Sequence, residues 1–183
     1  MVKKILVALD GSPPSQGALD LAIHLATNTT ANLLALTVVS DAPLTEAEVD
    51  LALSNYQPEV GELFVEPAFV TAPAPGCDAL DRKGRASPER SLAIRQAMAR
   101  HVLAQAAAVA RQTGFPPIET LLRSGDPATA ILAVAAAESP DLLVIGSRGF
   151  SNRAGSLIGS VSDKVIRESA CSVMVVKPTE PED

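Results

Sequence analysis

The chain has 183 residues, of which 47% are hydrophobic and only 3% aromatic, and its formal net charge is −6. This length suffices for one α/β domain with a buried sheet, whereas the negative charge and the few aromatic rings argue against a protein that coats nucleic acid or an anionic membrane. Two cysteines are too few for a disulfide framework and no Cys/His cluster has metal-ligand spacing, so we expect a cytoplasmic protein with reduced thiols.

The first regular elements are two buried strands with a helix between them. A continuous apolar run, Ile5–Leu9, is typical of a strand that is buried on both faces. Ser12 followed by Pro13 is a helix-start signal, and the helical spacing of apolar residues continues to about Asn28. The run Leu33–Val39 is the second strand, and the two strands with their helix form a right-handed βαβ unit.

Asp10 and Val38 both fall at the carboxyl ends of these strands. In open parallel sheets, this is the edge at which ligands bind, where the strand order reverses. Asp10 precedes a Gly-Ser-Pro-Pro turn, so it could face such a ligand or could shape the turn, and the residues alone leave both interpretations open.

The segment 41–87 is irregular. Thr45 and Glu48 match a capping box that would open a short helix, but the prolines that follow prevent a long helix or a central strand. We interpret the chain as a single domain, residues 1–178, with a Pro-rich insertion at about 55–87. Such long irregular segments are usually mobile or functional, and the apolar residues of this one favour packing on the domain or on a partner protein. The acidic end, residues 179–183, is expected to be disordered.

The second half of the chain alternates helical patterns with apolar runs. Helices are predicted to start at the Ser-Pro and Asp-Pro pairs of residues 87–88 and 126–127, the first of them ending at about residue 113. Three further strands are expected at 118–122, 141–145 and 173–176, the first of them at or near an edge of the sheet. Five apolar runs in alternation with helices predict an α/β layer fold around a mostly parallel sheet.

The segment 146–162 connects the fourth strand to the last helix and is rich in glycine and serine. Backbone amides can converge on an anion at such a passage, so it has the character of a phosphate cradle. Its spacing is Gly146-x2-Gly149-x9-Gly159-Ser160. This spacing differs from the dinucleotide fingerprint, the P-loop and the protein-kinase glycine loop.

The charge of this region also favours a small anion, because residues 146–167 hold four cations and one carboxylate; solvated side chains on a loop and a helix are the alternative interpretation. The cations are Arg148, Arg153, Lys164 and Arg167, and the carboxylate is Asp163. Ser160 is expected to cap the last helix and, with Asp163, matches a capping box. The carboxylate of that box would compete with a bound phosphate.

This glycine spacing within five strands resembles the ATP-binding branch of the universal stress protein (UspA-like) family, whose motif is Gly-x2-Gly-x9-Gly-Ser/Thr. The resemblance covers nearly all of the chain outside 41–87. It implies an open five-stranded parallel sheet of order 3-2-1-4-5 with helices on both faces, a Rossmann-like adenine nucleotide-binding fold. It also implies ATP as the ligand, with AMP or ADP possible and Mg²⁺ accompanying the nucleotide, and a homodimer that pairs through the last strand, Val173–Val176.

The resemblance assigns roles by motif position. Asp10 would face the ribose or a phosphate-bound Mg²⁺, and the Val38 backbone would meet adenine. Gly146 and Gly149 would make room for the ribose and the α-phosphate. The remaining cofactor-binding residues are Arg148 and Gly159 in the loop, and Ser160, Val161 and Ser162, which would hold the β- and γ-phosphates.

Three functions follow from these observations. The favoured one is a nucleotide-dependent stress or signalling module that binds ATP and hydrolyses it slowly at most, because the sequence offers no evident general base or lysine for the γ-phosphate and thus no catalytic residue. The second is a genuine metal-dependent ATPase or a nucleotidyl-transfer enzyme that uses Asp10 and a divalent ion. The third is an interaction protein that binds an unknown partner through 41–87, with the nucleotide incidental.

Overall fold

The computed structural model describes residues 1–45, 49, 87–149 and 157–178. The predicted helix after Thr45, the Pro-rich insertion and the acidic tail lie almost wholly outside these ranges. The described elements are, in chain order, β1 (Lys4–Leu9), α1 (Pro13–Thr29), β2 (Asn32–Val39), α5 (Pro88–Gln112), β3 (Glu119–Ser124), α6 (Pro127–Glu138), β4 (Leu142–Gly146), α7 (Ser160–Glu168) and β5 (Ser172–Val176).

The five strands form one sheet of order β3-β2-β1-β4-β5, and every neighbouring pair is parallel. This confirms the predicted fold class and strand order. The central strand is β1, in which Val7 lies opposite Ala35 of β2 and Val144 of β4. The chain leaves β1 toward β2 on one side and later returns to β4 on the other. The sheet therefore reverses its order between β1 and β4, and the loops that follow these two strands flank the switch point.

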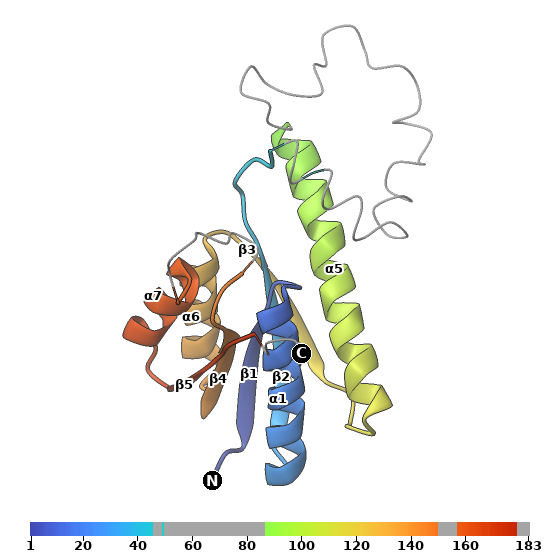
Figure 1. Ribbon diagram of the computed structural model, residues 1–183, viewed down its shortest axis with the longest axis vertical. Coiled ribbons are helices and arrows are strands. Elements are labelled where there is room, and N and C mark those ends of the chain that lie inside the picture. The colour runs from blue at the N-terminus through green and yellow to red at the C-terminus, as the bar shows by residue number, and fades with distance from the viewer. Residues whose placement is uncertain (46–48, 50–86, 150–156, 179–183) are drawn as a thin grey trace, which may run out of the picture.

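Helices cover both faces of the sheet, with α1 and α5 on one side and α6 and α7 on the other (Figure 1). Alternate residues of β1 enter the two cores. Ile5, Val7 and Leu9 pack with α1 and α5. Leu6 and Ala8 pack with α6. A strand with two buried faces needs apolar residues at every position, which is why β1 is a continuous apolar run rather than an alternating one.

The predicted helix starts are confirmed in position. Ser87 precedes α5 and its hydroxyl accepts a hydrogen bond from the Arg90 amide at 3.2 Å. Asp126 precedes α6 and its carboxylate accepts from the Thr129 amide at 3.0 Å. Ser12 precedes α1 but makes no side-chain cap. Its hydroxyl is used elsewhere, at the switch point.

Strand β3 is an edge strand, as predicted, but it occupies Glu119–Ser124 and so ends two residues later than expected. Its pairing with β2 continues to Val39 opposite Ser124, and this pairing draws the polar residues Arg123 and Ser124 into the strand. An edge strand tolerates such residues because one of its sides faces solvent. The opposite edge is β5, which pairs with β4.

Candidate functional site

The loop after β1 is organised by Asp10. Its Oδ1 accepts hydrogen bonds from the Ser12 amide at 2.9 Å and from the Ser12 hydroxyl at 2.5 Å. Between them, Gly11 has a φ of 86°, a left-handed conformation that favours glycine. Its amide donates to the Ser15 hydroxyl at 3.1 Å. Asp10 therefore shapes the turn into α1, as one of the two interpretations of the sequence proposed.

The other carboxylate oxygen of Asp10 faces the loop after β4. A Cβ atom placed on Gly149 would collide with this Oδ2. The two loops also approach each other at the Ser12 hydroxyl, whose single hydrogen goes to Asp10 and whose oxygen lies 3.4 Å from the Arg148 carbonyl oxygen. The structure thus brings Asp10, Arg148 and Gly149 together across the switch point, although they are far apart in the sequence.

Gly146 has a packing role that the sequence did not reveal. A Cβ atom on this residue would lie 2.9 Å from the carbonyl carbon of Pro14 and 2.9 Å from the Ser15 nitrogen. Only glycine therefore allows the first turn of α1 to approach the end of β4 so closely. Because α1 occupies the space beside Gly146, packing explains the missing side chain, and a contact with ribose stays a prediction.

Helix α7 begins at Ser160, as predicted, but its capping residue differs from the prediction. Its N-cap is Gly159, and Ser160 is the first helical residue, so Ser160 does not cap the helix. The Gly159 amide donates to the Ser147 carbonyl at 2.7 Å, and the first turn closes with the Asp163 amide bonded to the Gly159 carbonyl at 2.9 Å. This leaves three amides without an acceptor in the helix, at its positive end. They belong to Ser160, Val161 and Ser162.

The predicted capping box is wrong for the same reason. A glycine N-cap has no side chain to exchange hydrogen bonds with Asp163. The Asp163 carboxylate instead pairs with Arg167, one turn further along the helix, at 3.1 Å. This exposed ion pair offsets part of the Asp163 charge, which weakens the expected competition with a bound phosphate.

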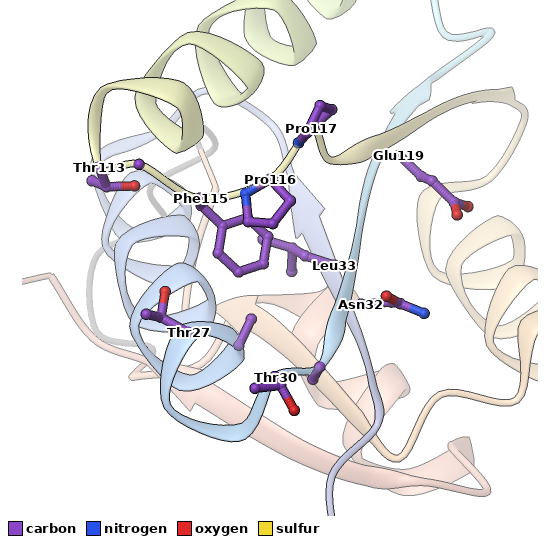
Figure 2. A pocket seen from close by; sticks show the side chains of 12 residues that line it. Thr27, Thr30, Asn32, Leu33, Thr113, Phe115, Pro116, Pro117 and Glu119 are labelled. Atoms are coloured by element: carbon purple, nitrogen blue, oxygen red, sulfur yellow. The ribbon is translucent and has the colours of Figure 1, made fainter.

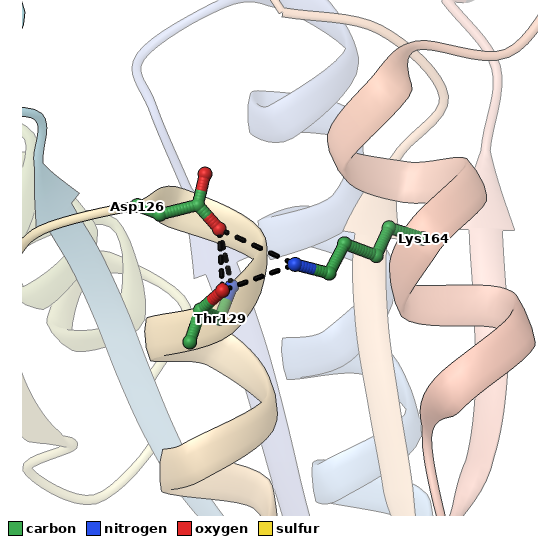
Figure 3. A network of polar contacts seen from close by, with 3 residues as sticks. All are labelled: Asp126, Thr129 and Lys164. Carbon is green, nitrogen blue, oxygen red and sulfur yellow. Dashed lines mark hydrogen bonds and ion pairs between the residues drawn. The ribbon is translucent and has the colours of Figure 1, made fainter.

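The local excess of positive charge is also smaller than the sequence indicates. Lys164 is directed to α6, where its Nζ lies 3.0 Å from the Thr129 hydroxyl and 3.6 Å from Asp126 Oδ1 (Figure 3). The hydrogen bonds from Thr129 and the charge of Lys164 lower the pKa of Asp126. With Arg167 paired as well, two of the four cations serve helix contacts, and Arg153 lies outside the described residues. Lys164 and Arg167 therefore contribute less to an anion site than their presence in the sequence suggests.

Two serines of the segment 146–162 are buried, and their hydroxyls differ in their hydrogen bonds. The Ser162 hydroxyl donates to the Gly146 carbonyl at 2.7 Å and ties α7 to the end of β4. Ser162 is therefore able to reach a ligand only through its backbone. Ser147 is 1% exposed, and its hydroxyl has no hydrogen-bond partner among the described residues. Sequence reasoning missed Ser147, because a serine between a glycine and an arginine gives no signal beyond that of an ordinary loop residue.

Val38 also lies at the carboxyl ends of the strands, but apart from Asp10, Arg148 and Gly149. It is half-buried near the end of β2 and pairs with Arg123 of β3. Strand β1 separates it from the glycine loop. A ligand that touched both Val38 and α7 would have to extend across the carboxyl end of β1, past Asp10.

A hollow of about 300 Å³ lies at the amino ends of strands β2 and β3, where helices α1 and α5 end (Figure 2). Phe115 and Pro116 contribute to its wall. The hydroxyls of Thr27 and Thr113 donate to carbonyls of their own helices, each at 2.8 Å. None of the predicted site residues lines this hollow. The hydroxyl hydrogens of Thr27 and Thr113 are already used in these bonds and are not available to a ligand.

An open parallel sheet with helices on both faces, two loops that meet at its switch point and free amides at the next helix start define a Rossmann-like nucleotide-binding class of fold. The universal stress protein family model matches residues 1–177, and the chain belongs to this family. In the described ranges, no helix combines the length and apolar character needed to cross a bilayer.

Individual relatives agree with this assignment. Universal stress protein YxiE of Bacillus subtilis is 32% identical over 177 residues, which cover 97% of this chain and 100% of that protein. The structure of universal stress protein UspA from Lactobacillus plantarum matches with a TM-score of 0.67 and 25% identity, over 96% of this chain and 98% of that one. A universal stress protein solved in complex with cAMP matches with a TM-score of 0.60 and 26% identity, over 97% and 99% of the two chains.

Proposed function

We propose that this protein binds an adenine nucleotide, ATP with Mg²⁺, between the β1 and β4 loops and acts as a nucleotide-dependent stress or signalling module. The observation that carries the proposal is the start of α7, where three successive amides without a helical acceptor follow a glycine N-cap held against the β4 loop. Amides so arranged are donors for phosphate oxygens. The cAMP complex of a relative supports an adenine nucleotide as the ligand.

In this proposal the nucleotide lies along the carboxyl edge of the sheet. Adenine meets the backbone at Val38, and the ribose passes Asp10. The phosphates reach the loop 146–149 and the amides of residues 160–162. Since one oxygen of Asp10 is held by Ser12, only Oδ2 is left for a ribose hydroxyl or for Mg²⁺. The ion would take its other ligands from phosphate and water, as Mg²⁺ commonly does.

Binding rather than turnover is the proposed activity. Phosphoryl transfer depends on positioned charge at the γ-phosphate, and Lys164 and Arg167 are engaged with Asp126 and Asp163. Hydrolysis is therefore at most slow. ATP turnover that disappears in Asp10→Ala would favour the metal-dependent ATPase instead.

We further propose that the protein is a homodimer that pairs through β5. This strand lies at an edge of the sheet, and Val173–Val176 are half-buried within the single chain. An apolar edge strand that stays uncovered invites association, and a second copy of the same strand would cover it. Sedimentation of the native protein would show a dimer, and a monomer at all concentrations would contradict this assembly.

Titration calorimetry with ATP, AMP and cAMP tests the nucleotide proposal. Wild type should bind at least one of them, and Gly159→Val should bind at least about tenfold more weakly, because its Cβ would lie 3.4 Å from the Arg148 Cα and the two further methyl groups would press on this loop. Gly17→Ala is the matched control, since a Cβ there meets only a Val176 methyl at 3.5 Å. Absence of binding in wild type, or equal binding by Gly159→Val, would overturn the proposal.

A further inference from the structure

The Ser147 hydroxyl is a buried donor with nothing to donate to in the described ranges. The residue is 1% exposed and its Oγ has no partner there, although both of its backbone groups are bonded. The Ser147 amide donates to the Val176 carbonyl at 2.7 Å, and its carbonyl accepts from the Gly159 amide at 2.7 Å. Buried hydroxyls are nearly always hydrogen-bonded because an unpaired one is costly, so this exception needs an explanation.

The direction of the Ser147 side chain follows from the strand, because the hydrogen bond from the Ser147 amide to the Val176 carbonyl continues the pairing with β5 one residue past β4. Successive residues of a strand point to opposite faces. Gly146 faces α1, because Pro14 and Ser15 crowd the position that a Cβ atom would take, whereas Ile145 packs in the core beside α6. Ser147 therefore shares the face of Ile145, which is the face that α7 covers. Its hydroxyl lies on the side of the loop where α7 begins.

We propose that the Ser147 hydroxyl donates a hydrogen bond to a phosphate oxygen of the nucleotide bound at the start of α7. A hydroxyl in this place needs an acceptor, and the free amides of the helix select an anionic one. Ser162, the other buried serine of the cradle, cannot fill this role because its hydroxyl is bonded to Gly146. The inference rests on the proposed nucleotide site and adds to it a phosphate-binding side chain outside the glycine motif.

The test compares Ser147→Ala with wild type in two measurements on the full chain. Without nucleotide, the melting temperature of Ser147→Ala should not fall, because the substitution removes an unpaired buried hydroxyl and no hydrogen bond. Its affinity for ATP should fall about tenfold, as expected for loss of a hydrogen bond to a charged group. Its affinity for adenosine, which has no phosphate, should stay unchanged.

Thr37→Val is the matched control. Thr37 holds another buried hydroxyl without a partner in the described part of the chain, on β2, two strands from β4. Side chains alternate along β2, so Thr37 shares the face of Leu33 and Ala35. This is the face opposite to that of Ser147. This variant should keep its affinity for ATP within about twofold of wild type.

The outcomes separate this inference from the nucleotide proposal. If wild type binds ATP and Ser147→Ala binds it equally well, Ser147 has no phosphate contact, whereas the nucleotide site stands. If adenosine affinity falls together with ATP affinity, the hydroxyl serves the nucleoside or the fold and the inference is wrong. If wild type binds neither ligand, both proposals fail together.

Discussion

Gly146→Ala is the substitution that most sharply tests how the site is built. The new methyl group would lie 2.9 Å from two backbone atoms of α1, in Pro14 and Ser15, and 3.0 Å from the Pro14 Cβ. None of these atoms belongs to a flexible side chain that could rotate away. The strand and the helix must therefore separate by several tenths of an ångström.

The expected cost follows from the contacts that such a shift disturbs. Overpacking a well-packed core costs about 1–3 kcal/mol. We expect a value near the middle, about 2 kcal/mol, because the start of α1 carries the Ser15 hydroxyl that holds the Gly11 amide and therefore cannot move independently of the β1 loop. For a protein of this size, such a loss lowers the melting temperature by roughly 4–8 °C.

Urea unfolding of Gly146→Ala, followed by circular dichroism, measures this cost directly. Gly17→Ala is the control for adding a methyl group where the same helix, α1, packs on the neighbouring strand β5. Its Cβ would contact only the Val176 Cγ1 at 3.5 Å, an ordinary distance. It should stabilise the protein by roughly 0.5–1 kcal/mol, since alanine is favoured over glycine inside a helix. A Gly146→Ala protein as stable as wild type would refute the close packing of α1 on β4.

Three further predictions concern single contacts. Gly149→Ala should lower the free energy of unfolding in the wild-type background but much less beside Asp10→Ala, because the Asp10 carboxylate is what the new methyl meets. Ser162→Ala should cost about 1 kcal/mol in urea unfolding, because it removes the buried hydrogen bond to the Gly146 carbonyl. Asp141 accepts hydrogen bonds from the Lys3 and Lys4 amides, which lower its pKa below the ordinary 3.8. Its stabilisation is present above that value and is lost as the pH falls through the lowered pKa, so melting curves of wild type and Asp141→Asn should differ at pH 7 and converge in acid.

Each of these predictions has a contradicting result. Strictly additive effects of the Gly149 and Asp10 substitutions would show that the two loops do not touch. Unchanged stability of Ser162→Ala would mean that its hydroxyl does not hold α7 to β4. Melting temperatures of wild type and Asp141→Asn that stay equally far apart from pH 7 to pH 3 would rule out a role for the ionised carboxylate.

Most of the helices and strands could be predicted because their signals are local, whereas the strand order was implied by the family resemblance. The continuous apolar runs of β1 and β2 identify doubly buried strands, and the Ser-Pro and Asp-Pro pairs mark helix starts at the correct residues. The end of β3 was misplaced because polar residues at an edge strand resemble a loop. Its length is decided by pairing with β2, a long-range contact that a local pattern does not contain.

The position of the glycine loop in the fold was predictable, but the contacts of its residues were not. The spacing of the glycines placed a cradle after β4, and the structure places Gly159 at the start of α7 as that spacing required. The pairing of Asp163 with Arg167, and of Lys164 with Asp126, depends on which way side chains turn on adjacent helices. The sequence shows only that these charges are present, and so it overstated both the cationic character of the loop and the capping role of Ser160.

The central claim is that this chain holds an adenine nucleotide at the β1–β4 switch point. Native mass spectrometry of the full chain with ATP and Mg²⁺ tests it most directly. We expect one nucleotide per chain at about 1 mM ATP, a concentration that detects even weak binding, and loss of the adduct in Gly159→Val. A chain that carries no nucleotide under these conditions, while Gly159→Val behaves in the same way, would contradict the claim.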